Sequence, residues 1–230
     1  MKALLIALVG IALVACQTSA DDKTVLKNEK DKISYSIGIN IGTNFKNQSI
    51  DVDVDALVKG IKDAISGNKT LLSEKEVQET LTAFQNDMRT KQAERAKAMA
   101  EKNKKEGETF LTENKKKEGI KTAANGLQYK IIKEGSGKKP KSTDTVTVHY
   151  RGTTIDGTEF DSSYKRGEPT SFPVNEVIPG WTEALQLMPV GSKWQLFIPS
   201  NLAYGERGAG PQIGPNATLL FEVELISIKQ

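Results

Sequence analysis

The spacing of apolar and polar positions changes near residue 126. Before that point, apolar residues recur every three or four positions, which predicts helices. After it, apolar and polar residues alternate in short runs bounded by glycine and proline, which predicts strands and turns. One later stretch, from Trp181 to Met188, keeps a helical spacing. The pattern therefore predicts an all-α part followed by a mostly antiparallel sheet wrapped on one short helix, an α+β arrangement.

The first predicted helix has apolar residues at every fourth position from Ile33 to Phe45. A second row with the same spacing contains small residues, among them Gly38 and Gly42. A glycine inside a helix costs about 1 kcal/mol relative to alanine. These two glycines either allow close approach of another helix or are simply tolerated.

Two further helices follow. Asp53 is an N-cap residue for the second. The third is expected to begin after Ser73, which forms a capping box with Glu76. It can run for roughly 40 residues, because residues 72–119 contain no proline. Its apolar stripe fades beyond Met88 into lysine-rich sequence, so its second half is predicted to be a solvated arm.

Three helices with small apolar faces bury little surface by themselves, and a second copy of the chain is the simplest remedy. We therefore predict a homodimer, with residues 31–100 as a helical dimerisation domain. Residues 101–125 would be a stalk helix and linker, and residues 126–230 a separate domain. Before them, residues 1–15 are expected to be a signal peptide and residues 16–30 a polar tether.

The amino terminus carries an apolar run from Ala3 to Ala15 that is too short to span a bilayer as a mature helix. It ends in Leu13-Val14-Ala15-Cys16, which resembles a bacterial lipobox and implies that Cys16 is acylated and anchors the protein to a membrane. The alternative is an ordinary signal peptide cleaved at Ala15 or Ala20. Cys16 is the only cysteine, so no intramolecular disulfide can form.

The most informative stretch begins at Val146, where apolar and polar residues alternate as far as Arg151. Asp156-Gly157 then provides a hairpin turn, because both residues tolerate positive φ. Phe160-Asp161 follows the turn, and Trp181 comes after a break at Pro179-Gly180. So many rings near one hairpin predict an apolar pocket.

At this point five motifs occur in a recognisable order, from Val148 to Leu225. They are Val148-His149-Tyr150-Arg151-Gly152, Gly157-Thr158-Glu159-Phe160-Asp161-Ser162-Ser163, Val177-Ile178-Pro179-Gly180-Trp181, Ala203-Tyr204-Gly205 and Leu220-Phe221-Glu222-Val223-Glu224-Leu225. Residues 126–230 thereby resemble the FKBP (immunophilin) family of peptidyl-prolyl cis-trans isomerases. The helical region before them is similar to the amino-terminal dimerisation domain of the macrophage infectivity potentiator type.

The resemblance implies roles for individual residues. Trp181 would form the floor under a substrate proline, Asp161 would hydrogen-bond near the twisting amide, and the Tyr204 hydroxyl and the Ile178 backbone N–H would each hold a substrate carbonyl. It also implies prolyl segments of unfolded proteins as substrates and rapamycin-type macrolides as inhibitors. The remaining substrate-binding residues that it implies are Tyr150, Phe160, Phe172, Val177 and Phe221.

The composition and the residue spacing argue against several other classes of function. The chain has 230 residues, 37% hydrophobic and 27% charged, with a formal net charge of +3. Basic and acidic residues balance over 126–230, so no clustered positive charge favours nucleic acid. The single histidine, His149, lacks a partner for a nucleophilic triad. Neither metal-ligand spacing nor a phosphate-binding loop is found, and we expect no metal and no cofactor.

The sequence therefore predicts a lipid-anchored, dimeric isomerase that assists the folding of envelope or secreted proteins. The expected location is the bacterial cell envelope, at the outer membrane and facing the periplasm or the cell surface. The alternative is a non-catalytic chaperone or surface binding module that grips unfolded or prolyl segments. A purely structural coiled coil does not fit, because the heptad pattern lasts only about two repeats.

Overall fold

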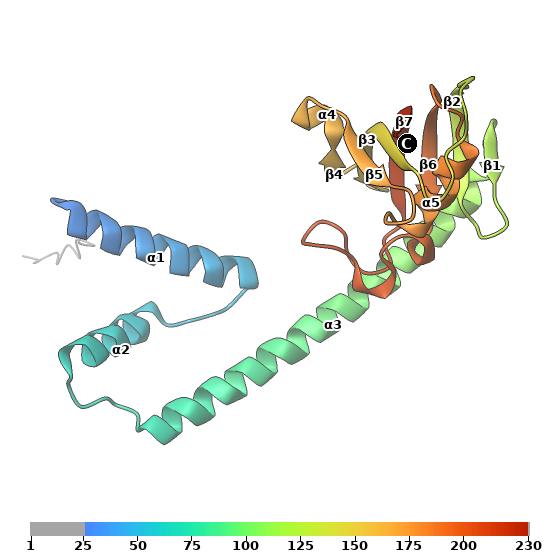
Figure 1. Ribbon diagram of the computed structural model, residues 1–230. Coiled ribbons are helices and arrows are strands. Elements are labelled where there is room, and N and C mark those ends of the chain that lie inside the picture. The colour runs from blue at the N-terminus through green and yellow to red at the C-terminus, as the bar shows by residue number, and fades with distance from the viewer. Residues whose placement is uncertain (1–25, 230) are drawn as a thin grey trace, which may run out of the picture. The chain divides into compact units, whose positions relative to one another are not determined.

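The computed structural model describes residues 26–229 (Figure 1). The chain divides into two compact units, residues 1–73 and 74–230. Cys16, and with it the predicted lipidation site, lies outside the described residues. Within residues 26–229, no helix has the length and apolar character needed to cross a bilayer.

The described part of the first unit contains helices α1 (Glu29–Gln48) and α2 (Val54–Ser66). The Asn28 side chain caps α1 by accepting a 3.0 Å hydrogen bond from the Asp31 N–H. Asp53 caps α2 as predicted, accepting a 2.9 Å bond from the Ala56 N–H. Both helices thus start where the cap residues of the sequence place them.

Within residues 26–229, the apolar faces of α1 and α2 are not covered. Ile33 and Ile37 on α1 are 54% and 56% exposed, and Ile65 on α2 is 81% exposed. A Cβ atom built on Gly38 or Gly42 would meet no heavy atom within 4 Å, so neither glycine packs against another element of the described residues 26–229. An apolar face of this kind is stable in water only when something else covers it.

The second unit starts with α3 (Glu74–Asn114), a helix of 41 residues that begins directly after Ser73 as predicted. The expectation that its second half is a solvated arm is wrong for the last turns. Asn114 is 1% exposed, and its amide donates a 3.0 Å hydrogen bond to the Gln128 side chain. Phe110 lies 6.0 Å from Phe197, ring centre to ring centre. These apolar and amide contacts outweigh the solvation of the neighbouring lysines.

A seven-stranded sheet forms the body of this unit, and every pairing in it is antiparallel. The strand order is β1-β2-β6-β7-β3-β4, with β5 also paired to β3. The strands are β1 (Ile120–Thr122), β2 (Gln128–Lys133), β3 (Thr145–Thr154), β4 (Glu159–Ser162), β5 (Thr170–Pro173), β6 (Lys193–Ile198) and β7 (Leu219–Lys229). The predicted α+β fold is confirmed, although the sequence pattern did not indicate the three-residue β1.

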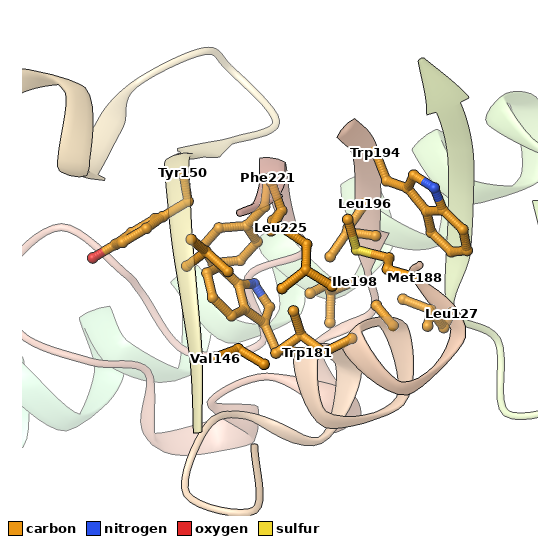
Figure 2. Close-up of a cluster of buried hydrophobic side chains, with 14 of the residues drawn as sticks. Leu127, Val146, Tyr150, Trp181, Met188, Trp194, Leu196, Ile198, Phe221 and Leu225 are labelled. Atoms are coloured by element: carbon orange, nitrogen blue, oxygen red, sulfur yellow. The ribbon is translucent and has the colours of Figure 1, made fainter. Parts of the chain in front are cut away.

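Helix α5 (Pro179–Leu187) covers one face of the sheet, and the core lies between them (Figure 2). The short helix α4 (Ser163–Arg166) and the 3₁₀ turns η1 (Ser200–Leu202) and η2 (Gly205–Arg207) were not predicted. Val146 and Val148 of β3 are fully buried, as their alternation with polar residues predicts. In Figure 2 the Tyr150 hydroxyl points away from the buried cluster. The ring of Tyr150 is therefore part of the core, whereas its hydroxyl lies outside it.

Candidate active site

The β3–β4 hairpin fixes one wall of the site. Gly157 has a φ of 87° and sits in the turn, as the Asp-Gly pair predicts. Beyond the turn, Asp161 lies opposite Gly152 in the β3–β4 ladder, and Phe221 of β7 lies opposite Gly152 on its other side. The two strands on either side of β3 thus place a carboxylate and an aromatic ring level with Gly152.

Asp161 and Phe221 line a cavity of about 560 Å³. Its size suits a few residues of a peptide or a small molecule. All nine residues that the sequence analysis assigned to catalysis or substrate binding lie on its wall. They are Tyr150, Phe160, Asp161, Phe172, Val177, Ile178, Trp181, Tyr204 and Phe221.

Trp181 is the centre of the apolar wall. The indole is 4% exposed, and three rings contact it edge-on: Tyr150 at 5.2 Å, Phe221 at 5.2 Å and Phe172 at 5.9 Å between ring centres. Phe160 continues the set through an edge contact with Phe221 at 5.5 Å. Each such contact contributes about 0.5–1.5 kcal/mol beyond burial, so the rings hold one another in fixed positions.

Gly152 makes this arrangement possible. A Cβ atom at this position would lie 2.6 Å from the Phe160 ring and 2.8 Å from the Phe221 ring. No side chain other than hydrogen fits there while both rings stay in place. The glycine therefore belongs to the construction of the pocket, although it contributes no side chain to it.

A polar triad stands at the rim of the pocket. The Asp161 carboxylate accepts a hydrogen bond from the Tyr150 hydroxyl at one oxygen and from the Arg166 guanidinium at the other. Arg166 also donates to the Tyr150 oxygen at 2.8 Å and to the Thr170 hydroxyl at 3.2 Å. Arg166 was missed in the sequence, because only the fold of α4 brings it back to Asp161, five residues earlier.

This triad sets the ionisation of its members. Partial burial opposes ionisation of Asp161, but the hydrogen bonds from Tyr150 and Arg166 outweigh it and hold the pKa of the carboxyl below its usual value. Burial, with the hydrogen bond to Asp161, raises the pKa of the Tyr150 hydroxyl. At neutral pH the rim therefore carries a carboxylate, a neutral phenol and a guanidinium.

Several donors of pocket-lining residues have no hydrogen-bond partner within residues 26–229, and one of them is the buried Nε1–H of Trp181. The Tyr204 side chain is 41% exposed, and its hydroxyl makes no hydrogen bond within residues 26–229. The Ile178 backbone N–H, directly before α5, likewise donates to no group in that part of the chain. The Tyr204 hydroxyl and the Ile178 N–H are therefore available to acceptors of a ligand.

The long loop between β6 and β7 supplies a wall that the sequence analysis did not assign residue by residue. A small bridge between Ala209 and Ile213, with N–O distances of 2.8 and 3.2 Å, folds its tip back on itself. The sequence did carry a signal for this wall, because the loop is long and rich in glycine and proline, and loops of this kind are often functional. The additional lining residues from this loop are Ala209, Gly210, Pro211, Gln212 and Ile213, and Glu176 joins them from the segment between β5 and α5.

His149 is held in the fold by contacts with Ser163 and Tyr164. Its Nδ1 lies 2.9 Å from the Ser163 hydroxyl, and its ring stacks on Tyr164 with 4.6 Å between centres. It does not line the pocket. Among residues 26–229, no group of three or more His, Cys, Asp or Glu side chains is placed to hold a metal ion.

An apolar pocket with an ionised rim and unpaired donors is consistent with the family suggested by the motifs, and the comparisons identify that family. Residues 136–226 match the model of the FKBP-type peptidyl-prolyl cis-trans isomerases, and residues 30–131 match the model of the domain amino-terminal to such isomerases. The chain is 51% identical to the outer membrane protein MIP of Legionella longbeachae, over all of this chain and 98% of that protein. This chain belongs to the FKBP-type peptidyl-prolyl cis-trans isomerase family.

Other relatives show that the similarity covers both units. The peptidyl-prolyl cis-trans isomerase Mip of Coxiella burnetii is 44% identical over the full length of both chains. The crystal structure of FkpA from Escherichia coli matches with a TM-score of 0.68 at 40% identity, covering 89% of this chain and 99% of that one. The FKBP fold predicted from the motifs is therefore confirmed, and the helices before it also belong to the shared architecture.

Proposed function

We propose that this FKBP-type isomerase accelerates rotation about X-Pro bonds of unfolded envelope or secreted proteins in the pocket above Trp181. The observation that carries the proposal is the pocket itself: a fixed aromatic wall beside hydrogen-bond donors that have no partner within residues 26–229. Binding alone would explain the rings. The unpaired donors of Tyr204 and Ile178 on the pocket wall could also hold carbonyl groups of a prolyl peptide, so an assay of acceleration decides between binding and catalysis.

The mechanism follows from what the reaction requires. Rotation breaks amide resonance, against a barrier of about 20 kcal/mol. The twisted amide is less polar than the planar one, so a site that excludes water and binds the twisted form more tightly lowers this barrier. Each 1.4 kcal/mol of such preference is worth about tenfold in rate.

Each group of pocket residues has a separate role in lowering the barrier to rotation. Trp181 and the rings around it take the proline side chain and exclude water. The Tyr204 hydroxyl and the Ile178 N–H each hold a substrate carbonyl, so that one side of the rotating bond is fixed while the other turns. Asp161 presents its charge at the rim, and its lone pairs beyond the two used by Tyr150 and Arg166 can still accept a hydrogen bond near the amide.

A protease-coupled assay on a prolyl tetrapeptide, with and without rapamycin, tests this function. We expect acceleration that rapamycin abolishes, because a macrolide that fills the aromatic pocket displaces the proline. Binding of prolyl peptides without acceleration would instead support the rival function, a chaperone or surface module that only grips its clients.

We further propose that the chain is a homodimer through residues 31–100, which leaves 126–230 as the isomerase domain and 101–125 as stalk and linker. The uncovered apolar faces of α1 and α2 support this assignment. Light scattering should give twice the chain mass. Ile37→Glu, which places a charge on the α1 face, should give the monomer mass, whereas Lys32→Glu on the same helix should leave the dimer intact.

We also propose a location for the protein in the cell. The sequence around Cys16 and the outer membrane name of the Legionella relative support a lipid-anchored protein of the bacterial envelope, at the outer membrane. Cys16→Ser should release the protein from membranes or block its maturation, because a hydroxyl cannot receive the thioether-linked lipid. Normal processing with unchanged membrane fractionation would contradict the anchor.

A further inference from the structure

A second cavity, of about 610 Å³, lies between α3 and the β3–β4 hairpin. We call it the α3 groove. Ala98 and Met99 line it from the helix, and Ile155 and Ala217 line it from the other side. Met99 is 50% exposed although it sits beside a folded domain, so the groove is open to solvent.

The α3 groove lies next to the aromatic pocket. Gln212 lines both cavities. On the hairpin, Thr158 lines the groove and Phe160 lines the pocket, and two residues of a strand span about 7 Å. A polypeptide that leaves the pocket in extended form, at about 3.3 Å per residue, therefore reaches the groove within a few residues.

The wall shared by the two cavities is fixed to the helix. The Asn103 amide donates a 2.8 Å hydrogen bond to the Pro215 carbonyl. At Gly214 a Cβ atom would lie 2.8 Å from the Met99 sulfur and 3.0 Å from the Asn103 amide nitrogen. The loop thus approaches α3 as closely as a glycine allows, and α3 helps to hold the segment that lines the pocket.

Most charges around the groove already have partners. Lys102 pairs with Glu106 at 3.9 Å. Asp156 accepts hydrogen bonds from the Thr154 hydroxyl at 2.6 Å and the Thr158 N–H at 3.0 Å. Arg95 has no ion pair within residues 26–229. The groove therefore favours an apolar ligand that carries a neutral or acidic residue, rather than a lysine, near Arg95.

We infer that the α3 groove binds the residues that flank the proline of the same client polypeptide, as an extended and mainly apolar segment. The inference rests on the proposed isomerase function. It makes α3 part of the substrate site and predicts that client affinity grows with peptide length. A tetrapeptide, whose extended length is about 13 Å, occupies the pocket without filling the groove.

The experiment measures that growth in the full-length protein. Two competitors of tetrapeptide isomerisation are compared: a prolyl tetrapeptide, and the same peptide extended at both ends by about four mainly apolar residues with one aspartate, each added residue reaching about 3.3 Å further. For each variant the result is the ratio of the two inhibition constants, so any general change in the pocket cancels. Ala98→Arg fills the groove, and Ala96→Arg, on another face of the same helix, is the matched control.

In the wild type and in Ala96→Arg, the longer peptide should bind about tenfold more tightly, which corresponds to 1.4 kcal/mol. In Ala98→Arg this ratio should fall to near one. A ratio near one in the wild type, or an unchanged ratio in Ala98→Arg, would overturn the inference. Absence of tetrapeptide isomerisation would instead contradict the isomerase function itself.

Discussion

Asp161 and Arg166 form an ion pair at the rim of the aromatic pocket, and the same guanidinium donates a 2.8 Å hydrogen bond to Tyr150. Tyr150 in turn packs edge-on against Trp181. One charged contact is therefore connected to the floor of the pocket through a single ring. The carboxylate has two functions in this arrangement: it presents charge at the rim, and it holds the phenol that forms one wall.

Asp161→Ala should reduce kcat/KM on a prolyl tetrapeptide by about 10- to 100-fold, because hydrogen bonds to charged groups contribute about 1.5–3 kcal/mol. The domain should remain folded, since the carboxylate is at the rim and not in the core. Glu168→Ala, an exposed carboxylate nearby that does not line the pocket, is the matched control. Unchanged catalytic efficiency of Asp161→Ala would remove Asp161 from the proposed mechanism.

The pH profile tests the ionisation of the rim. The pKa of Asp161 is lowered on folding, so the carboxylate is charged above its ordinary pKa of about 3.9, and its contribution disappears only as the pH falls through the lower folded value. The pKa of Tyr150 is raised, so the phenol stays neutral below its ordinary value of about 10.

We therefore expect kcat/KM to be flat between about pH 5 and pH 9, with no step from either group. The measurement is the isomerisation rate of one peptide in a constant-ionic-strength buffer series. A transition inside this range that is absent from Asp161→Ala would show that the carboxyl titrates there and that Arg166 does not hold it ionised.

Gly152→Ala should lower kcat/KM by about tenfold or more, as one misplaced wall that costs 1.4 kcal/mol of transition-state binding would do. The new methyl group would meet the Phe160 and Phe221 rings at 2.6 and 2.8 Å, so one ring must move into the pocket. Rapamycin affinity should fall with it. Gly60→Ala, where a Cβ atom meets nothing within 4 Å, is the control and should leave activity unchanged. Equal activity of both variants would show that the rings adjust without cost.

Local patterns predicted the sheet and the pocket well because each is encoded by short-range signals. The alternation around Tyr150, the Asp156-Gly157 turn and the helical spacing from Trp181 all specify structure within a few residues, and the structure confirms them. Arg166 was missed because its partners, Asp161 and Tyr150, meet it only after α4 has formed. No periodicity marks a contact of that kind.

The contacts made by the last turns of α3 also could not be predicted from the pattern of apolar residues. The lysines and glutamates of α3 indicate a solvated surface, and most of that surface is solvated. Several residues of α3 nevertheless contact the sheet domain, among them Asn103, Gly107, Phe110 and Asn114. Their spacing of four, three and four is helical, but two asparagines and a glycine do not form an apolar stripe. The contact depends on amide hydrogen bonds and close approach, which hydrophobic patterns do not report.

These contacts decide where the isomerase domain can be separated from the helices before it. A fragment from Thr122 contains every pocket residue, but it leaves the buried Gln128 side chain without Asn114 and Leu111, and it exposes Phe197. An unsatisfied buried amide costs about 1–3 kcal/mol. A fragment from Arg95 keeps the α3 residues that contact the domain.

We therefore predict that the fragment 95–230 is monomeric, is more stable than the fragment 122–230 by about 2–4 kcal/mol, and turns over a tetrapeptide as well as the full chain. Refolding of a proline-limited protein should still be slower with the fragment than with the full chain. A dimer presents two pockets to one client, which raises the effective concentration of the second pocket once the first is occupied. Light scattering, urea unfolding and the two activity assays measure these differences. If the fragment 95–230 is dimeric, or if peptide and protein activities fall together, then α1 and α2 are not a separable dimerisation unit.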